Sequence, residues 1–381
     1  MKPIYLDQPG DYSGDTWHVA AVLILNENVE IIQTVSKPVE DAEKKALQAR
    51  ALYCELGFAK KVRSFFTDEN FAKDLKRATP EGKLQYLGRN EEEAKKNLLI
   101  AIPGIDTPIQ GIYKSTSVIM HHLEANGLSA TIERLRSEFT SNFSSRYPNA
   151  KTMIDEIVKS IPTDAVLVNG RFSNYTNTAN LDANLFKSIS QVVTNRDRTL
   201  PLIIVANKKF EPFVNKWGIK YDGWRDIYDL HPSVANIWGT GLVNMLGTAY
   251  FWSVLRDRKP KVAVIGGRSG SLDIASFMGL RTIAWDDLST DDPECARHII
   301  QSPFLNSIFH YNQKMKDDIF KYRIKNGSAK ALSAKDALAA FLFQKEHLRP
   351  IYSSNYFGEV IMNGMEPKDR DEKVYRTEDK E

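Results

Sequence analysis

The chain has 381 residues, of which 42% are hydrophobic and 26% charged, a composition typical of a soluble globular protein long enough for two domains. Its formal net charge of +3 is too small to indicate or to exclude a polyanionic partner. The only cysteines, Cys54 and Cys295, exclude a disulfide framework and a cysteine-based metal cluster. The start lacks a signal-peptide pattern and no apolar run has the length of a membrane span, so we expect a cytoplasmic protein.

The first part of the chain alternates strand-like and helix-like segments. Short apolar runs predict strands over His18–Leu25, 29–35 and 97–102. Helical spacing of apolar residues predicts helices over 38–58, over 107–124 with a start at Thr107-Pro108, and over 130–160. The strongly charged residues between 59 and 97 predict solvated helices and a loop.

The alternation continues in the second part of the chain. Strands are predicted over 164–169, over 200–206 and at both ends of the segment 261–287. Helices are predicted over 181–193, over 231–256 with a break near 239–241, and over 333–348 with Ser333 as the cap.

Strands that alternate with helices predict α/β domains whose parallel sheets are covered on both faces. We expect two Rossmann-like domains, at 1–160 and 161–350, with a cleft between them. A third segment, 351–381, ends in a run of charged residues that predicts a mobile tail. Ligands of such sheets bind at the carboxyl ends of the strands, where the loops PGIDTP, NGRFSNYTN and GGRSGS are placed.

The strongest ligand-binding signal is the segment 261–287, KVAVIGGRSGSLDIASFMGLRTIAWDD, which reads as one strand–loop–helix–strand unit. Its glycines let backbone approach a ligand, its hydroxyls and guanidinium can bind phosphate, and a helix start leaves N–H groups unpaired. The residues predicted to bind a diphosphate are Gly266, Gly267, Arg268, Ser269, Gly270 and Ser271. The alternative is a tight turn in which Arg268 makes a structural ion pair. Neither the dinucleotide-binding nor the P-loop pattern is present, which disfavours a dehydrogenase or an NTPase.

This unit resembles the last βαβ segment of the C-terminal domain in GT-B-type glycosyltransferases and related sugar-nucleotide epimerases. The resemblance rests on the Gly/Ser loop, the small and acidic residues of the helix and the GLRTI strand. It implies that Ser269, Gly270 and Ser271 face the diphosphate of a nucleotide-sugar donor, and that Asp273 binds a hydroxyl. It also implies sugar transfer without a metal ion or a cofactor.

Two further groups of polar or aromatic residues are candidates for substrate binding. In the loop that begins at Asn169, Asn169 itself is a candidate for contact with the substrate or nucleotide, Arg171 could bind a phosphate, and Asn174 and Asn177 could bind hydroxyls or amides. The alternative is a polar surface loop in which asparagine serves the turn geometry. Trp238, beside a glycine pair that interrupts a predicted helix, could stack on a base or a sugar, or could belong to the core.

No single residue stands out as the catalytic base. Asp106 and His231 lie beside strand-end loops and Asp273 lies in the predicted binding helix, so all three are candidates. The adjacent His121 and His122 face different sides of a helix, which favours a structural role over a metal pair.

Three functions from different classes follow. The first is a transferase that moves a sugar from a nucleotide donor to an acceptor bound near residues 103–108. The second is aminoacyl-tRNA-dependent acyl transfer, as in cyclodipeptide synthases, with the basic stretches 60–63, 195–198 and 256–261 on the tRNA. The third is a non-catalytic protein that binds a nucleotide or another protein.

Overall fold

The structure is a computed structural model. It describes residues 4–9, 16–35, 42–66, 83–86, 109–110, 119, 122–123, 125–172, 180–196, 198–228, 242–267, 269–286, 307–310, 319–323, 329–333 and 349–350.

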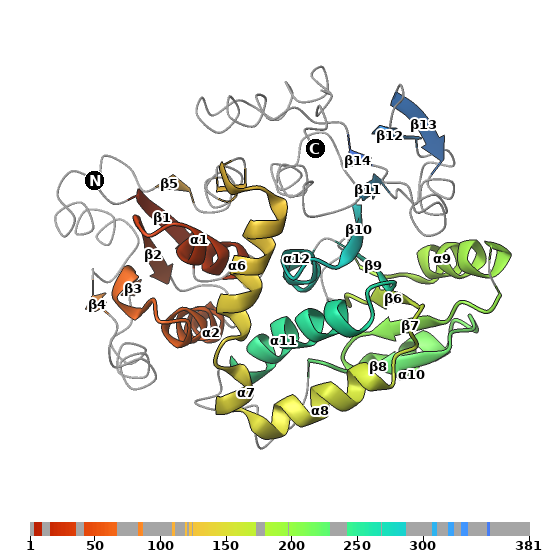
Figure 1. The fold of residues 1–381 in the computed structure, drawn as a ribbon, viewed down its shortest axis with the longest axis horizontal. Helices are drawn as coiled ribbons and strands as arrows, with labels where there is room; N and C mark the ends of the chain where they lie inside the picture. Colours follow the sequence, from red (N-terminus) through yellow and green to blue (C-terminus); the bar gives the residue numbers. More distant parts are fainter. Residues whose placement is uncertain are drawn as a thin grey trace. The chain divides into compact units, whose positions relative to one another are not determined.

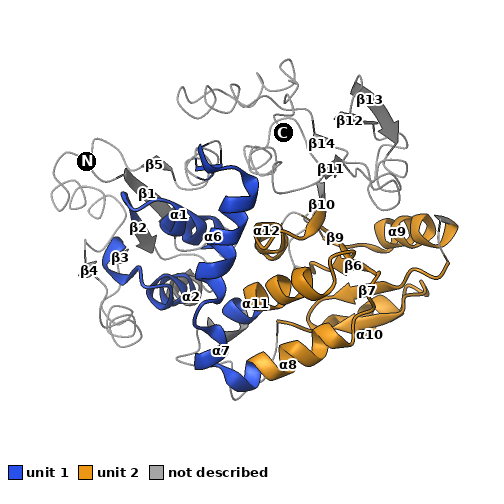
Figure 2. Cartoon of the chain, viewed as in Figure 1, with its two compact units in different colours: residues 1–150, 230–247 blue, residues 151–229, 248–381 orange. Residues whose placement is uncertain are grey.

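The chain divides into two compact units, which Figure 2 shows in separate colours. The first unit contains residues 1–150 and 230–247, and the second contains 151–229 and 248–381. The predicted domain limits of 1–160, 161–350 and 351–381 stay a prediction.

The first unit is built on a five-stranded sheet with the order β4-β3-β2-β1-β5, in which every neighbouring pair is parallel (Figure 1). Its strands are β1 (Ile4–Pro9), β2 (Val29–Val35), β3 (Val62–Phe66), β4 (Lys83–Tyr86) and β5 (Ile109–Gln110). Its helices include α1 (Thr16–Leu25), α2 (Ala42–Glu55), η1 (Ala59–Lys61), α6 (Leu128–Thr140) and α7 (Phe143–Arg146).

The predicted strand over His18–Leu25 is wrong, because this segment belongs to helix α1. Every residue of α1 is buried, and the ring of Trp17 packs edge-on against Phe139 of α6 with the ring centroids 5.7 Å apart. A helix that is apolar on all sides has no amphipathic period, so its sequence cannot be distinguished from that of a buried strand.

Two more predictions in this unit need correction. In the charged region 59–97 the described residues form η1 and the strands β3 and β4, which the sequence did not predict, while residues 67–82 and 87–97 lie outside the described residues. Residues 109–110 form strand β5, so no helix begins at Thr107-Pro108, although residues 122–123 are helical. The predicted strand over 97–102 lies outside the described residues.

The second unit is built on a six-stranded sheet with the order β11-β10-β9-β6-β7-β8, again parallel throughout. Its strands are β6 (Val166–Asn169), β7 (Leu202–Val205), β8 (Gly223–Arg225), β9 (Ala263–Gly267), β10 (Arg281–Asp286) and β11 (Ser307–His310). Its helices include α9 (Ala183–Arg196), η2 (Lys208–Phe210), α10 (Glu211–Asn215) and α12 (Gly270–Phe277). Two further helices, α8 (Pro148–Lys159) and α11 (Leu242–Arg258), begin in the first unit and end in the second. The parallel α/β class is therefore confirmed.

The strand order of this second sheet defines a switch point. The chain runs outward from β6 through β7 to β8, then returns to β9 on the other side of β6 and continues outward to β10 and β11. In such doubly wound sheets, ligands bind beyond the carboxyl ends of the strands at the point where the order reverses. That point lies between β6 and β9.

A third, antiparallel sheet has the order β13-β12-β14, with strands β12 (Ile319–Arg323), β13 (Ala329–Ser333) and β14 (Arg349–Pro350). Ser333 is thus the last residue of a strand, and the helix predicted after it lies outside the described residues.

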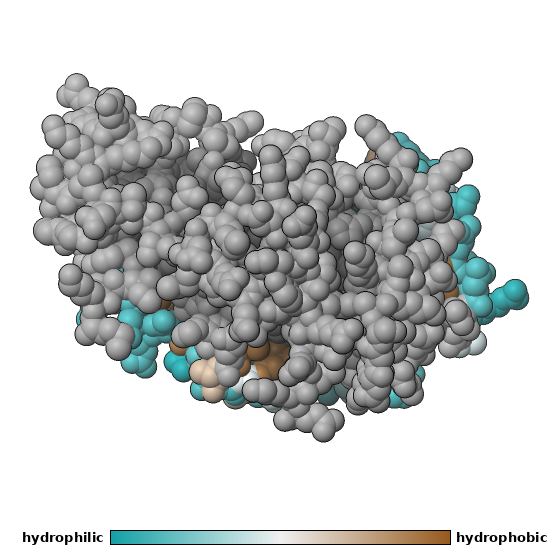
Figure 3. Space-filling model, turned by 90° about the horizontal axis from the view of Figure 1, so that it is seen from above, coloured by the Kyte–Doolittle hydropathy of each residue, from teal (hydrophilic) through white to brown (hydrophobic). Residues whose placement is uncertain are grey.

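Figure 3 shows one face of the molecule, on which the coloured residues are mainly hydrophilic with small hydrophobic patches.

The core of the second unit forms between its sheet and α9. All four residues of β6 and of β7 are buried, as expected for strands covered on both faces. Phe186 of α9 is completely buried there, and its ring lies 6.1 Å from that of Trp217, whereas Phe213 of α10 is 52% exposed.

We predict that Phe186→Ala lowers the free energy of unfolding by about 3–5 kcal/mol, because it leaves a cavity in this core. The matched control Phe213→Ala removes the same atoms from a largely exposed ring and should cost under about 1 kcal/mol. Urea unfolding of both variants, followed by circular dichroism, tests the difference. Equal losses would contradict the placement of Phe186.

Candidate functional site

The candidate site lies at the switch point, where the ends of β6 and β9 are adjacent. Asn169, the last residue of β6, pairs with Gly266 of β9 in the parallel register. Only two residues separate the end of β9 at Gly267 from the start of α12 at Gly270. The predicted loop therefore turns directly from the central strand into a helix whose N-terminus lies at the ligand-binding edge of the sheet.

Gly266 is required at its position by close packing rather than by an unusual backbone angle. A Cβ atom there would lie 2.9 Å from Cδ1 of Leu272 and 3.3 Å from Cβ of Asn169. Leu272 belongs to the first turn of α12, so the absence of a side chain at Gly266 allows this turn to approach the strand. Gly266 and Gly267 are both buried, which favours a packing role for them over direct contact with a ligand.

The first turn of α12 has the features of an anion-binding site. Ser269 is the N-cap, in an extended conformation, and its side chain makes no capping hydrogen bond. Its carbonyl oxygen accepts the N–H groups of Leu272 and Asp273, so the intrahelical bonds begin there. The N–H groups at a helix start and the positive end of the helix dipole favour a negatively charged ligand.

A network of side-chain hydrogen bonds connects this turn to the end of β6 and to Tyr228. Nδ2 of Asn169 donates to Oγ of Ser271 at 3.0 Å, and the hydroxyl of Tyr228 donates to Oδ1 of Asn169 at 2.6 Å. The hydroxyl oxygens of Ser269 and Ser271 lie 3.0 Å apart, within hydrogen-bonding distance. Asn169 is buried, whereas Ser269, Ser271 and Tyr228 are partly exposed, so Asn169 is the member of the network that is shielded from a ligand.

Sequence reasoning missed Tyr228, which follows the outer strand β8. Its N–H donates to Oδ1 of Asp226 at 2.9 Å, while Oδ2 of Asp226 accepts the N–H of Lys208 at 2.7 Å. The Asp-x-Tyr spacing after a strand indicates a turn held by the aspartate side chain. Nothing in the sequence indicates that the tyrosine passes the end of β7 and reaches β6.

The environment of Tyr228 keeps its phenol protonated. Burial raises the pKa of Tyr228 far above its ordinary value, and the negative charge of Asp226 raises it further, while a hydrogen bond with Ser271 acts in the opposite direction. Tyr228 is therefore a neutral hydrogen-bond donor over the whole physiological pH range.

The structure describes some of the other predicted site residues. Asp273 lies in the first turn of α12 and is completely buried, which favours a structural role over contact with a sugar or ribose hydroxyl. Arg171 follows β6 by two residues and is partly buried. The other candidates, Asp106, Arg268, Asn174, Asn177, His231 and Trp238, lie outside the described residues, so their roles stay predictions.

The described residues include His122 but not its neighbour His121. Within them, no group of three or more metal-ligating side chains is present. Burial lowers the pKa of His122, the charge of Arg134 lowers it further, and a hydrogen bond with the backbone at Leu25 raises it. His122 thus contacts the end of α1, consistent with the predicted structural role.

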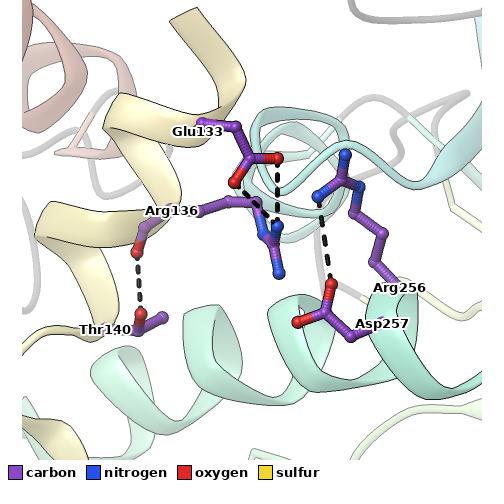
Figure 4. Close-up of polar contacts among 5 residues, drawn as sticks. All are labelled: Glu133, Arg136, Thr140, Arg256 and Asp257. Carbon is purple, nitrogen blue, oxygen red and sulfur yellow. Dashed lines mark hydrogen bonds and ion pairs between the residues drawn. The ribbon is translucent and has the colours of Figure 1, made fainter. Parts of the chain in front are cut away.

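The basic stretch 256–261, one of the proposed tRNA contacts, is largely paired with carboxylates. Arg258 lies 3.0 Å from Asp155, and Lys261 lies 3.7 Å from Asp164. Figure 4 shows the longer contact of Arg256 with its neighbour Asp257, at 3.9 Å, and also the pair of Arg136 with Glu133 within α6. Cations that are already paired neutralise fewer phosphates, so this stretch is a weaker nucleic-acid surface than its sequence suggests.

None of the described helices is both long and apolar enough to cross a membrane.

No protein-family model and no curated protein match the chain. Among solved structures it is similar to a glycosyl transferase family 9 protein from Veillonella parvula DSM 2008, with a TM-score of 0.35 and 11% identity over 74% of this chain and 80% of that one. It is also similar to the ADP-heptose lps heptosyltransferase II of E. coli, with a TM-score of 0.39 and 11% identity over 91% of this chain and 99% of that one. Likenesses at these TM-scores establish no family for the chain.

We predict that Gly266→Ala destabilises the chain by about 1–3 kcal/mol, because the added methyl group overlaps Leu272. In the Leu272→Ala background the same change should cost clearly less, since the overlapping atom is gone. Urea unfolding of the two single variants and the double variant measures this coupling. Simple additivity would show that Gly266 is not required by contact with Leu272.

A second prediction concerns alkaline pH. The pKa of Tyr228 is raised on folding from an ordinary value of 10.0, so the stability that its protonated form contributes is complete below pH 10. Above pH 10 the unfolded chain ionises first and this stability is lost, by about 1 kcal/mol per pH unit. The difference in unfolding free energy between the wild type and Tyr228→Phe should therefore shrink between pH 9 and pH 11. A constant difference would contradict the raised pKa.

Proposed function

We propose that this chain is a sugar transferase of the GT-B type, with a nucleotide-sugar as the donor and its diphosphate at the loop between β9 and α12. The observation that carries the proposal is the position of this loop: a glycine- and serine-rich turn opens a helix at the switch point of a doubly wound parallel sheet. The acceptor would bind on the side of the first unit, near residues 103–108.

In this proposal the leaving group is a nucleoside diphosphate, so negative charge develops on its terminal phosphate as the glycosidic bond breaks. The N–H groups at the start of α12 and the hydroxyls of Ser269 and Ser271 donate to that phosphate. Arg268 supplies the positive charge that a metal ion supplies in other transferases. The reaction then needs no metal ion and no cofactor.

The acceptor hydroxyl also needs a base. Among the three candidates, Asp273 is completely buried in the helix, so we assign the role first to Asp106 or His231. Arg171 follows β6 and is assigned to the second phosphate or to the sugar. Asn174, Asn177 and Trp238 remain candidates for the nucleoside.

The proposal predicts that one or more of UDP, GDP and ADP, or their sugar conjugates, raise the melting temperature of the chain, because ligand binding stabilises the folded state. Arg268→Ala should weaken this binding at least about tenfold, the effect of losing a charge-assisted hydrogen bond. Arg256→Ala, which removes an arginine paired with Asp257, is the matched control and should change nothing. Chelation of divalent metals should also leave binding unchanged.

Transfer itself is measured as release of the nucleoside diphosphate from the stabilising nucleotide-sugar in the presence of carbohydrate acceptors. Stabilisation without release in any acceptor mixture would favour a non-catalytic nucleotide-binding protein. Binding of bulk tRNA with a steep salt dependence, and of no nucleotide, would replace the proposal with the acyl-transfer function.

A further inference from the structure

We propose that Tyr228 and Asn169 are positioning residues, which hold Ser271 and the first turn of α12 in the orientation that receives a diphosphate without touching the ligand themselves. The inference rests on the proposed function of the β9–α12 loop. It assigns a role to a tyrosine outside the loop and changes the role of Asn169 from ligand contact to support.

Asn169 is poorly placed to bind a ligand directly. Its side chain is only 2% exposed, and both ends of its amide are engaged, with Oδ1 accepting from Tyr228 and Nδ2 donating to Ser271. The amide keeps one further N–H and one further lone pair, but its burial shields them from a ligand that approaches the serine hydroxyls. Its bonds instead connect the end of β6 to the helix that begins after β9.

Tyr228 adds a connection across the sheet. The strand β7 separates β8, which Tyr228 follows, from β6, which carries Asn169. Asp226 fixes the start of this connection, because its two carboxylate oxygens accept the N–H groups of Lys208, just beyond β7, and of Tyr228. The end of β6, the segments after β7 and β8, and the start of α12 are therefore connected by hydrogen bonds.

The network ends on the groups that a ligand can reach. Ser271 receives the bond from Asn169, and Ser269, at 3.0 Å from Ser271, is the N-cap of the helix. Hydroxyls that are already oriented do not have to be ordered when the anion binds, so a fixed network increases affinity. Loss of the Tyr228 hydroxyl, which donates to Asn169, should thus weaken diphosphate binding through the changed orientation of Ser271.

The test compares Tyr228→Phe with Tyr221→Phe. Both changes remove one hydroxyl that donates to an asparagine Oδ1 at 2.6 Å, but Tyr221 bonds to Asn215, the last residue of α10, and takes no part in the network. With the nucleoside diphosphate that stabilises the wild type, calorimetry should show a Kd about tenfold higher for Tyr228→Phe, and unchanged within twofold for Tyr221→Phe. Inorganic pyrophosphate should show the same pattern.

A merely structural role would lower the stability of Tyr228→Phe without changing the Kd of the folded protein. The double variant Tyr228→Phe, Ser271→Ala tests whether Tyr228 affects binding through Ser271. If it does, Tyr228→Phe should change the Kd less than twofold in the Ser271→Ala background, where the serine hydroxyl is absent. Asn169→Ser provides a second variant, with the same expected loss of affinity, should Tyr228→Phe not fold.

The outcomes separate the inference from the function on which it rests. A wild type that binds no diphosphate overturns the proposed function and this inference together. A wild type that binds, with Tyr228→Phe binding equally well, overturns the inference alone. Full additivity of Tyr228→Phe and Ser271→Ala overturns the route through Ser271.

Discussion

The contact between β6 and β9 is the constraint on which the candidate site depends. These two strands are not consecutive, and they become neighbours only because the chain completes β7 and β8 on one side before it returns. Their pairing places Asn169 beside Gly266. Without it, Asn169 and Ser271, which are joined by a hydrogen bond, would belong to distant parts of the sequence with no common site.

Close packing at this contact explains why the loop is rich in glycine. Because Leu272 and Asn169 fill the space around Gly266, a larger residue there would overlap the Leu272 side chain, and either this side chain or the first turn of α12 would have to move. A shift of this turn would lengthen the hydrogen bond between Asn169 and Ser271. The glycine thus links a requirement of the core to the geometry of the candidate site.

The sequence predicts the second unit better than the first for a physical reason. The strands β6, β7 and β9 are short apolar runs bounded by turn residues, so local pattern and final structure agree. Helix α1 is buried on all sides, and its apolar run has no period that distinguishes a helix from a strand. The hydroxyls of the loop can likewise be predicted from a local motif, whereas Tyr228 cannot, because its role follows from strand order and not from its neighbours in the chain.

The asparagine at the buried position 169 indicates that folding stability alone does not determine which residues lie at this edge of the sheet. The residues opposite it on the two neighbouring strands are Val205 and Gly266, and the three residues before it in β6 are apolar. A valine at this buried position would carry no polar group that needs a partner, whereas the amide requires donors and acceptors placed with precision. Tyr228, from the segment after β8, and Ser271, from the first turn of α12, meet that requirement at the edge where a doubly wound sheet binds its ligands. A polar network with these members is better explained by the need to fix the start of α12 than by a gain in folding free energy.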